Sequence, residues 1–319
     1  MTPASAVPNA QRDTVNAIAQ RFGIPERSIS IAPRQGQVNL TVFLGDDLVV
    51  RLPRRPDLEG RLVKEAELIP FLRERDIPTP ELISFDPSHT IAEVNYIVLQ
   101  RIRGQEIADI APPSGGNDRV YGSLFAILDI LHSVGKEVEQ SIPSVEESAF
   151  SDEELLDELA TSGEIGGSQA SWLRRWFLHL EAHGARSSEP RLLHGDVMPS
   201  NLILNEAGRV AAIIDWGSAR WGEPARDLAG FRTSTLPAVV DIYRQSRHAD
   251  PADDRSGIAS LEASVLWYQL FFALAKLLGK QSTSETRNWS APRAARFLEI
   301  LRFLSTEAPD RWRALLLTP

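Results

Sequence analysis

The amino-acid sequence predicts an α+β fold made of two lobes with a cleft between them. A chain of 319 residues is longer than one core usually fills and suits two lobes of roughly 100 to 200 residues. Short strand-like runs dominate up to Gly104, whereas most of the chain beyond Gly104 has helical periodicity. The apolar content of 43% and the charged content of 24% are ordinary for a globular protein, so we expect an enzyme-sized chain rather than a small binding module.

The front part of the chain predicts a small antiparallel sheet with two helices. An amphipathic helix is expected from Asn9 to Phe22, because Gly23 and Pro25 then end it. Gly45 and the two aspartates after it form a hairpin turn between two strand-like runs. A second helix is expected over 57–75, where apolar residues recur at helical spacing. The predicted strands are 28–33, 38–44, 48–52, 81–85 and 95–102.

The rest of the chain predicts helices around one β-rich island. The island covers 191–214, and its last two strands are joined across Glu206-Ala-Gly208. We therefore predict a first lobe over 1–104, a hinge at about 99–104 and a second lobe over 105–319. The expected helices are 118–134, 151–161, 168–183, 224–247, 257–279 and 291–306.

Composition excludes several classes of protein. The chain contains no cysteine, which rules out disulfides, cysteine-ligated metals and thiol nucleophiles and indicates a reducing compartment, the cytoplasm. A net charge of −9 argues against nucleic-acid binding, and all of it lies after Gly104, since 1–104 hold thirteen basic and thirteen acidic residues. The apolar stretch 266–279 is too short to cross a bilayer and is expected to be a buried core helix, so no membrane partner is predicted.

The strongest motif is His194-Gly-Asp196 with Asn201, followed by Asp215-Trp-Gly. An Asp with an Asn five positions later, and then a second Asp opening Asp-x-Gly, has the spacing of the kinase catalytic and metal loops. Asn201 begins one strand of the predicted hairpin and Asp215 ends the other, so antiparallel pairing brings the two oxygen ligands together. This pair is a plausible Mg²⁺ site, because Mg²⁺ needs only one or two protein oxygens besides waters and phosphates.

Asp196 lies on the loop that enters this hairpin. There it could accept the proton of an acceptor hydroxyl lined up with a γ-phosphate, which is the role of a general base. His194 is expected to bond the loop backbone and hold Asp196 in place rather than transfer a proton. Taken alone, Asp and Asn residues most often mark turns and caps.

These motifs resemble the aminoglycoside phosphotransferases, a family of antibiotic kinases that includes macrolide kinases and has a protein-kinase-like bilobal fold. The resemblance covers about Gly36 to Leu278, but only 192–230 is specific. It implies that Asp196 is the catalytic base and that Asn201 and Asp215 are the magnesium ligands. Asp227 matches an acidic position that braces the catalytic loop, although an exposed helical carboxylate is the alternative interpretation.

The same resemblance places nucleotide binding in the first lobe. Arg51 stands where a third-strand lysine usually meets the α- and β-phosphates, and we interpret it as a variant that still binds phosphate. Its carboxylate partner is expected to be Glu65, with Glu67 as the alternative. The loop around Gly36 is the expected phosphate cover. Further candidates for nucleotide contact are the backbone amides of Gln37 and Asn39, and the backbone from Gln100 to Ile102 beside a purine of ATP or GTP.

The acceptor side is predicted from composition alone. Acidic residues without any Lys or Arg gather between Ser141 and Gly163 and could attract a cationic acceptor, although a solvated acidic helix also explains them. The candidate acceptor residues are Asp152, Glu153, Glu154 and Asp157. The aromatic residues that could line a macrolide pocket, or simply form core, are Trp172, Trp176, Trp267, Phe271 and Phe272.

The leading prediction is a magnesium-dependent kinase that uses ATP or GTP to phosphorylate a hydroxyl of an antibiotic-like small molecule, and that is a monomer or weak dimer. The alternatives are a metabolic kinase of an amino alcohol or sugar, and a catalytically dead nucleotide sensor.

Overall fold

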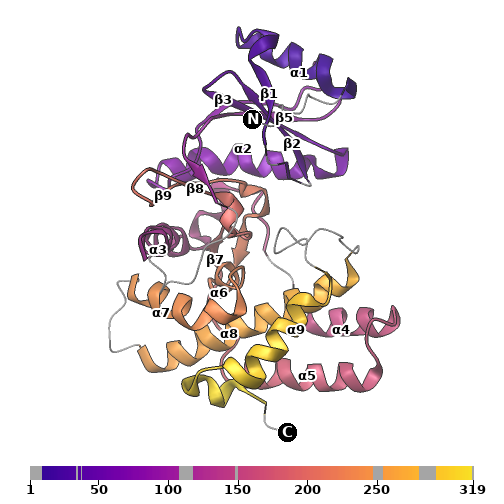
Figure 1. The fold of residues 1–319 in the computed structure, drawn as a ribbon, viewed down its shortest axis with the longest axis vertical. Coiled ribbons are helices and arrows are strands. Elements are labelled where there is room, and N and C mark those ends of the chain that lie inside the picture. Colours follow the sequence, from indigo (N-terminus) through magenta and orange to yellow (C-terminus); the bar gives the residue numbers. More distant parts are fainter. Residues whose placement is uncertain are drawn as a thin grey trace. The chain divides into compact units, whose positions relative to one another are not determined.

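The computed structural model shows two compact units (Figure 1). The structure describes residues 9–33, 35–36, 38–107, 118–147, 150–246, 254–279 and 292–317. Unit 1 comprises 1–107, 138–145 and 200–219, and unit 2 comprises the remaining segments. The sequence prediction assigned everything after Gly104 to a second lobe, whereas two later segments, including the 200–219 hairpin, fold with unit 1.

Unit 1 contains a five-stranded antiparallel sheet in the order β1-β2-β3-β5-β4 and two helices, α1 and α2. The strands are β1 (Ile29–Ile31), β2 (Asn39–Leu44), β3 (Leu48–Pro53), β4 (Leu82–Asp86) and β5 (Tyr96–Gln100). The helices are α1 (Asn9–Arg21) and α2 (Glu59–Arg73). All seven elements were predicted within a few residues.

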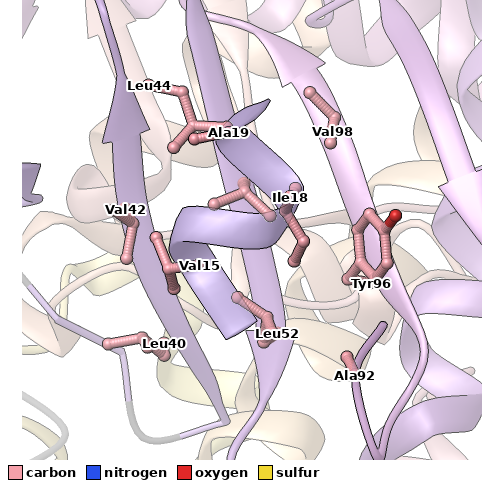
Figure 2. Close-up of a cluster of buried hydrophobic side chains, with 11 residues drawn as sticks. Val15, Ile18, Ala19, Leu40, Val42, Leu44, Leu52, Ala92, Tyr96 and Val98 are labelled. Atoms are coloured by element: carbon pink, nitrogen blue, oxygen red, sulfur yellow. The ribbon is translucent and has the colours of Figure 1, made fainter. Parts of the chain in front are cut away.

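The core of unit 1 lies between α1 and one face of the sheet (Figure 2). Val15 and Ile18 of α1 pack against the inward side chains of β2, β3 and β5, and both are fully buried. Strand side chains alternate between faces, so Val50 and Leu52 join this core while Arg51 lies on the opposite face. That face carries α2, which packs against β4 and β5.

A second, three-stranded sheet in unit 1 has the order β6-β8-β9. Its strands are β6 (Gln105–Glu106), β8 (Leu202–Leu204) and β9 (Val210–Ile213). The predicted hairpin is therefore present as β8 and β9, with Leu202 opposite Ile213. The island's first strand, β7 (Arg191–Leu193), belongs instead to unit 2, where it pairs with β10 (Arg220–Gly222), a strand that the sequence analysis did not predict.

Unit 2 is mainly helical. Its helices are α3 (Asp118–Ser133), α4 (Asp152–Thr161), α5 (Gly167–Ala182), α6 (Ala225–Leu228), α7 (Leu236–Ser246), α8 (Asp254–Ala275) and α9 (Ala295–Arg302). The prediction of one helix over 224–247 is wrong. Within the described part of this range the chain is α-helical only over Ala225–Leu228 and Leu236–Ser246, and between them Gly230 lies so close to another segment that a Cβ would be 2.4 Å from the Val197 carbonyl oxygen.

Helix α8 forms the centre of unit 2. Within the described residues, one helical segment, Ser260–Leu278, is long and apolar enough to span a membrane, but 72% of it is buried inside the protein. Trp267 is fully buried and its ring stacks on Phe271 at 5.2 Å between centroids. The prediction of a core helix is confirmed here, and Trp267, Phe271 and Trp176 are core residues, whereas Trp172 and Phe272 are only partly buried.

Candidate active site

Arg51 and Glu65 form the predicted ion pair in unit 1. Because Arg51 lies on the face of the sheet opposite α1, its side chain points toward α2 and is buried. The Arg51 Nη1 donates to the Glu65 Oε2 at 2.5 Å, and Glu65 is completely buried. Glu67, the alternative partner, instead accepts a hydrogen bond from the Ser144 amide at 3.0 Å.

The same guanidinium also contacts Asp215, since the Arg51 Nη2 donates to its Oδ1 at 2.6 Å. Burial alone would lower the pKa of Arg51, but the carboxylates of Asp215 and Glu65 raise it above its ordinary value. Burial raises the pKa of Glu65 to about 7, although the Arg51 charge opposes this shift. Arg51 is therefore a permanently charged group that bridges two carboxylates.

The open end of the β8–β9 hairpin brings Asn201 and Asp215 together in the backbone. The Ile214 amide donates to the Asn201 carbonyl at 2.9 Å, which continues the pairing to the residue beside Asp215. Asp215 has a φ of 68°, a left-handed conformation that is strained for most residues and is concentrated at functional sites. Its side chain is 41% exposed while it pairs with Arg51.

This pair fits Mg²⁺ in its donor chemistry. One amide oxygen and one carboxylate suit an ion that keeps waters and takes its other ligands from phosphates. No group of three or more His, Cys, Asp or Glu residues that could hold a metal occurs among the residues that the structure describes. A magnesium site at Asn201 and Asp215 stays a prediction.

The predicted nucleotide cover is described only in part. Gln37 lies outside the described residues, and Asn39 begins β2 with a buried side chain. The segment before β2 is held by Gln35, whose side chain hydrogen-bonds both backbone groups of Thr41. Arg54 also donates to the Gly36 carbonyl at 3.2 Å. The sequence analysis missed this bracing because a glutamine in a loop carries no distinguishing pattern.

The predicted hinge follows the end of β5. The Gln100 amide donates to the Glu81 carbonyl at 2.9 Å, so it is used within the sheet. Ile102 lies in the irregular segment that connects β5 to β6. A purine contact at Gln100 or Ile102 remains a prediction.

The loop that carries Asp196 belongs to unit 2 and is held from within. Gly195 has a φ of 80°, which a side chain such as arginine would disfavour, and this explains a glycine between His194 and Asp196. The Asp196 amide donates to the His194 Nδ1 at 3.2 Å, and His194 is completely buried. The structure therefore shows the contact expected if His194 supports the loop.

Asp227 braces the same loop through its carboxylate. It accepts hydrogen bonds from the amides of His194 at 2.9 Å and Gly195 at 2.8 Å, and it lies 3.1 Å from the His132 Nε2. The alternative of an exposed helical carboxylate is wrong, because Asp227 is 1% exposed. Burial opposes ionisation, but these donors hold the pKa of Asp227 below its ordinary value.

His132 of α3 was missed by the sequence analysis. Its Nδ1 lies 2.7 Å from the Tyr243 hydroxyl of α7, so the imidazole links Asp227 to two helices. His132 is separated in the sequence from Asp227 by 95 positions and from Tyr243 by 111 positions. No local motif could therefore have indicated these contacts.

A pocket of about 210 Å³ lies beside Asp196 within unit 2. Its lining includes Gly230 and Phe272 together with two arginines, Arg226 and Arg296, that the sequence analysis did not single out. None of the four acidic residues proposed for the acceptor lines it.

Those four residues form what we call the acidic face of α4. Two of them have basic neighbours from elsewhere in unit 2, since Asp157 pairs with Arg174 at 3.3 Å and Asp152 with Arg186 at 3.8 Å. Glu153 and Glu154 are exposed, and the Glu154 amide is capped by the Ser151 hydroxyl. Part of the acidic face is thus paired within the unit.

The two units and the motifs they carry define a protein-kinase-like α+β phosphotransferase. The sequence over residues 31–258 matches the phosphotransferase enzyme family APH. The chain belongs to this family.

The individual relatives compared below are 21% to 27% identical to this chain. The chain is 27% identical over 265 residues to the uncharacterized protein YcbJ of Bacillus subtilis, covering 75% of this chain and 84% of that protein. The GDP complex of aminoglycoside 2'-phosphotransferase-IIIa superposes with a TM-score of 0.68 at 21% identity, over 92% of this chain and 98% of the other. The macrolide 2'-phosphotransferase MphH of Brachybacterium faecium gives a TM-score of 0.58 at 21% identity, over 97% and 99% of the two chains. These structural likenesses confirm the predicted fold class.

Proposed function

We propose that the protein transfers the γ-phosphate of ATP or GTP to a hydroxyl of a small molecule. The observation that carries this proposal is the Arg51 guanidinium, which bridges Glu65 and Asp215 at 2.5 and 2.6 Å. A phosphate-binding cation is thereby fixed beside a carboxylate that suits magnesium. The presence of Asp196, Asn201 and Asp215 together favours an enzyme over an inactive nucleotide sensor, because a sensor needs no general base.

In this proposal each unit contributes one part of the chemistry. The residues of unit 1 hold the donor: Arg51 binds the α- and β-phosphates, and Asn201 and Asp215 would hold Mg²⁺. Bound Mg²⁺ would neutralise charge on the transferring phosphoryl group. In unit 2, Asp196 accepts the proton of the acceptor hydroxyl while the hydroxyl oxygen attacks the γ-phosphorus, and the bond from this phosphorus to the β–γ bridging oxygen breaks, so that ADP or GDP leaves.

Two candidate functions differ in the class of acceptor. An antibiotic, either an aminoglycoside or a macrolide, is supported by the two antibiotic phosphotransferases that share this fold. A metabolic kinase is the second candidate, and the basic pocket beside Asp196 favours it. A cytoplasmic location and a monomeric or weakly dimeric state remain predictions.

Two substitutions test the assignment of roles. We expect Asp196→Asn to lower turnover by about 10²- to 10⁴-fold with nearly unchanged nucleotide affinity, because only a proton acceptor is lost. Asp215→Asn removes the negative charge of a proposed magnesium ligand. It should therefore weaken the binding of both the nucleotide and Mg²⁺. Turnover is measured with nucleotide, Mg²⁺ and a panel of aminoglycosides, macrolides and hydroxylated metabolites. Equal effects on nucleotide affinity would contradict these roles, and no acceptor-stimulated turnover with any compound would favour a sensor.

A further inference from the structure

The pocket beside Asp196 is basic, in contrast to the acidic sequence around it. Of the described residues that line it, Arg226 and Arg296 carry positive charge and Asp196 alone carries negative charge. The chain as a whole has a net charge of −9, so the local sign is opposite to the average. The charge of the pocket, rather than that of the chain, decides which ligand group it can hold.

Arg226 is built into the wall of this pocket. Its residue is 8% exposed, and its guanidinium lies over the rings of Phe150 at 4.9 Å and Phe272 at 5.6 Å. The Arg226 Nη2 donates to the Gly195 carbonyl at 3.3 Å, next to Asp196. Burial, together with the charge of Arg220, lowers the pKa of Arg226 to about 10, which leaves it charged at neutral pH.

Arg296 reaches the same pocket from α9. Its Nη2 donates to the carbonyls of Ala229 at 2.8 Å and Phe231 at 3.4 Å, which are neutral acceptors. Burial lowers the pKa of Arg296, although Glu299 opposes the shift. The guanidinium groups of Arg226 and Arg296 therefore converge on one small cavity, in which Asp196 is the only carboxylate among the described lining residues.

We propose that Arg226 and Arg296 bind an anionic group of the acceptor, a carboxylate or a phosphate, while Asp196 faces the hydroxyl to be phosphorylated. Guanidinium groups match the geometry of both anions and bind them bidentately. The volume of about 210 Å³ also suits a metabolite-sized compound, since pockets for drug-sized ligands span about 300 to 1,000 Å³. This inference rests on the proposed function, because it names the acceptor class of the same site.

Binding of matched compounds tests the proposal separately from turnover. The probes are glucuronate, glucose 6-phosphate, glucose and glucosamine, with glycerate, glycerol 3-phosphate, glycerol and 2-aminopropane-1,3-diol as a smaller series. Binding to the full chain is measured by ligand-observed NMR with the nucleotide site saturated by a non-hydrolysable analogue. We expect at least one anionic compound to bind at least 10-fold more tightly than its neutral counterpart, as hydrogen bonds to charged groups predict. Within each series, the affinities of the carboxylate and the phosphate compound show which of the two anions the pocket binds more tightly.

The variants Arg226→Met and Arg296→Gln should each abolish this preference. Arg226→Met keeps the length of a buried side chain without its charge, so the protein is expected to stay folded, and Arg296→Gln provides an independent test. Arg302→Gln is the matched control, because Arg302 lies on the same helix with a side chain that is 64% exposed. The proposal is overturned if no anionic compound is preferred in either series, if the cationic compounds bind best, or if the preference survives both pocket variants.

Two further outcomes separate the two proposals. Weaker nucleotide binding in the pocket variants would overturn the acceptor role, because the arginines would then serve the donor phosphates. Anion binding without any phosphorylation would contradict the kinase function and leave the anion site established.

Discussion

Because the carboxylate of Asp227 braces the loop that carries Asp196, we expect its removal to lower the free energy of unfolding substantially. Asp227→Ala leaves the buried amide of His194 and the partly buried amide of Gly195 without their acceptor. An unsatisfied buried donor costs about 1 to 3 kcal/mol, so the His194 amide alone should cost this much, and the partly buried Gly195 amide should add less. Asp227→Asn retains one acceptor oxygen and should lose roughly half of this. Both changes should also lower turnover, because Gly195 precedes Asp196.

Equilibrium unfolding in urea measures these losses, with Asp241→Asn as the control. Asp241 forms a partly exposed pair with Arg311 at 2.9 Å, and its loss should cost less than about 1 kcal/mol. The pKa of Asp227 is lowered in the folded state, so its ionised form stabilises the protein above its unfolded pKa near 3.9, and this stabilisation is lost as pH falls through the folded pKa. The difference between wild type and Asp227→Asn should therefore stay constant from pH 8 to 5. If Asp227→Asn cost no more than Asp241→Asn, the reasoning would be refuted.

Three more predictions concern charge. Arg51→Ala should lose nucleotide affinity and turnover, and Arg51→Lys should restore only part of each, because an ammonium cannot bridge Glu65 and Asp215 as a planar fork does; a fully active alanine variant would show that another cation binds the phosphates. The pKa of Glu65 is raised to about 7 in the folded state, so the folded state binds this proton more tightly than the unfolded state does. The protein should therefore gain stability as pH falls from about 7 toward 4.5. Glu65→Gln should remove this pH dependence from the free energy of unfolding measured in urea. Neutralising the acidic face of α4 should leave the KM for an anionic acceptor unchanged. If a cationic acceptor were bound at this face, its KM would instead be higher in the variant than in the wild type, and its KM for the wild type would rise with salt.

Local patterns were sufficient to predict the five-stranded sheet, its two helices and the hairpin. Residue alternation identified β3, and the same alternation places Arg51 on the face that meets Glu65. Asn201 and Asp215 stand before and after the hairpin in the sequence, and this order was enough to predict that they meet at one end, because a hairpin fixes its own register.

Features that depend on distant packing were beyond sequence reasoning. The strand β10 pairs with β7 across nearly thirty residues, and the pairing has no turn signal between the strands. The backbone of Val197 passes close to Gly230, a contact between distant segments, whereas the residues around Gly230 continue a helical pattern. Arg226 looked like an ordinary helical residue, and only the aromatic rings of Phe150 and Phe272 make it part of a pocket wall.

The discontinuity of unit 1 has a consequence for biosynthesis. Its last segment ends at Ala219, 112 residues beyond Ile107, and a ribosome needs roughly 6 to 22 s to add them at about 5 to 20 residues per second. During that interval the nascent sheet and α2 lack the Asp215 carboxylate, so the guanidinium of Arg51 has only Glu65 as a partner. We expect the N-terminal sheet to remain immature until two thirds of the chain has emerged, which makes this stage of translation the one at which the protein most needs a chaperone.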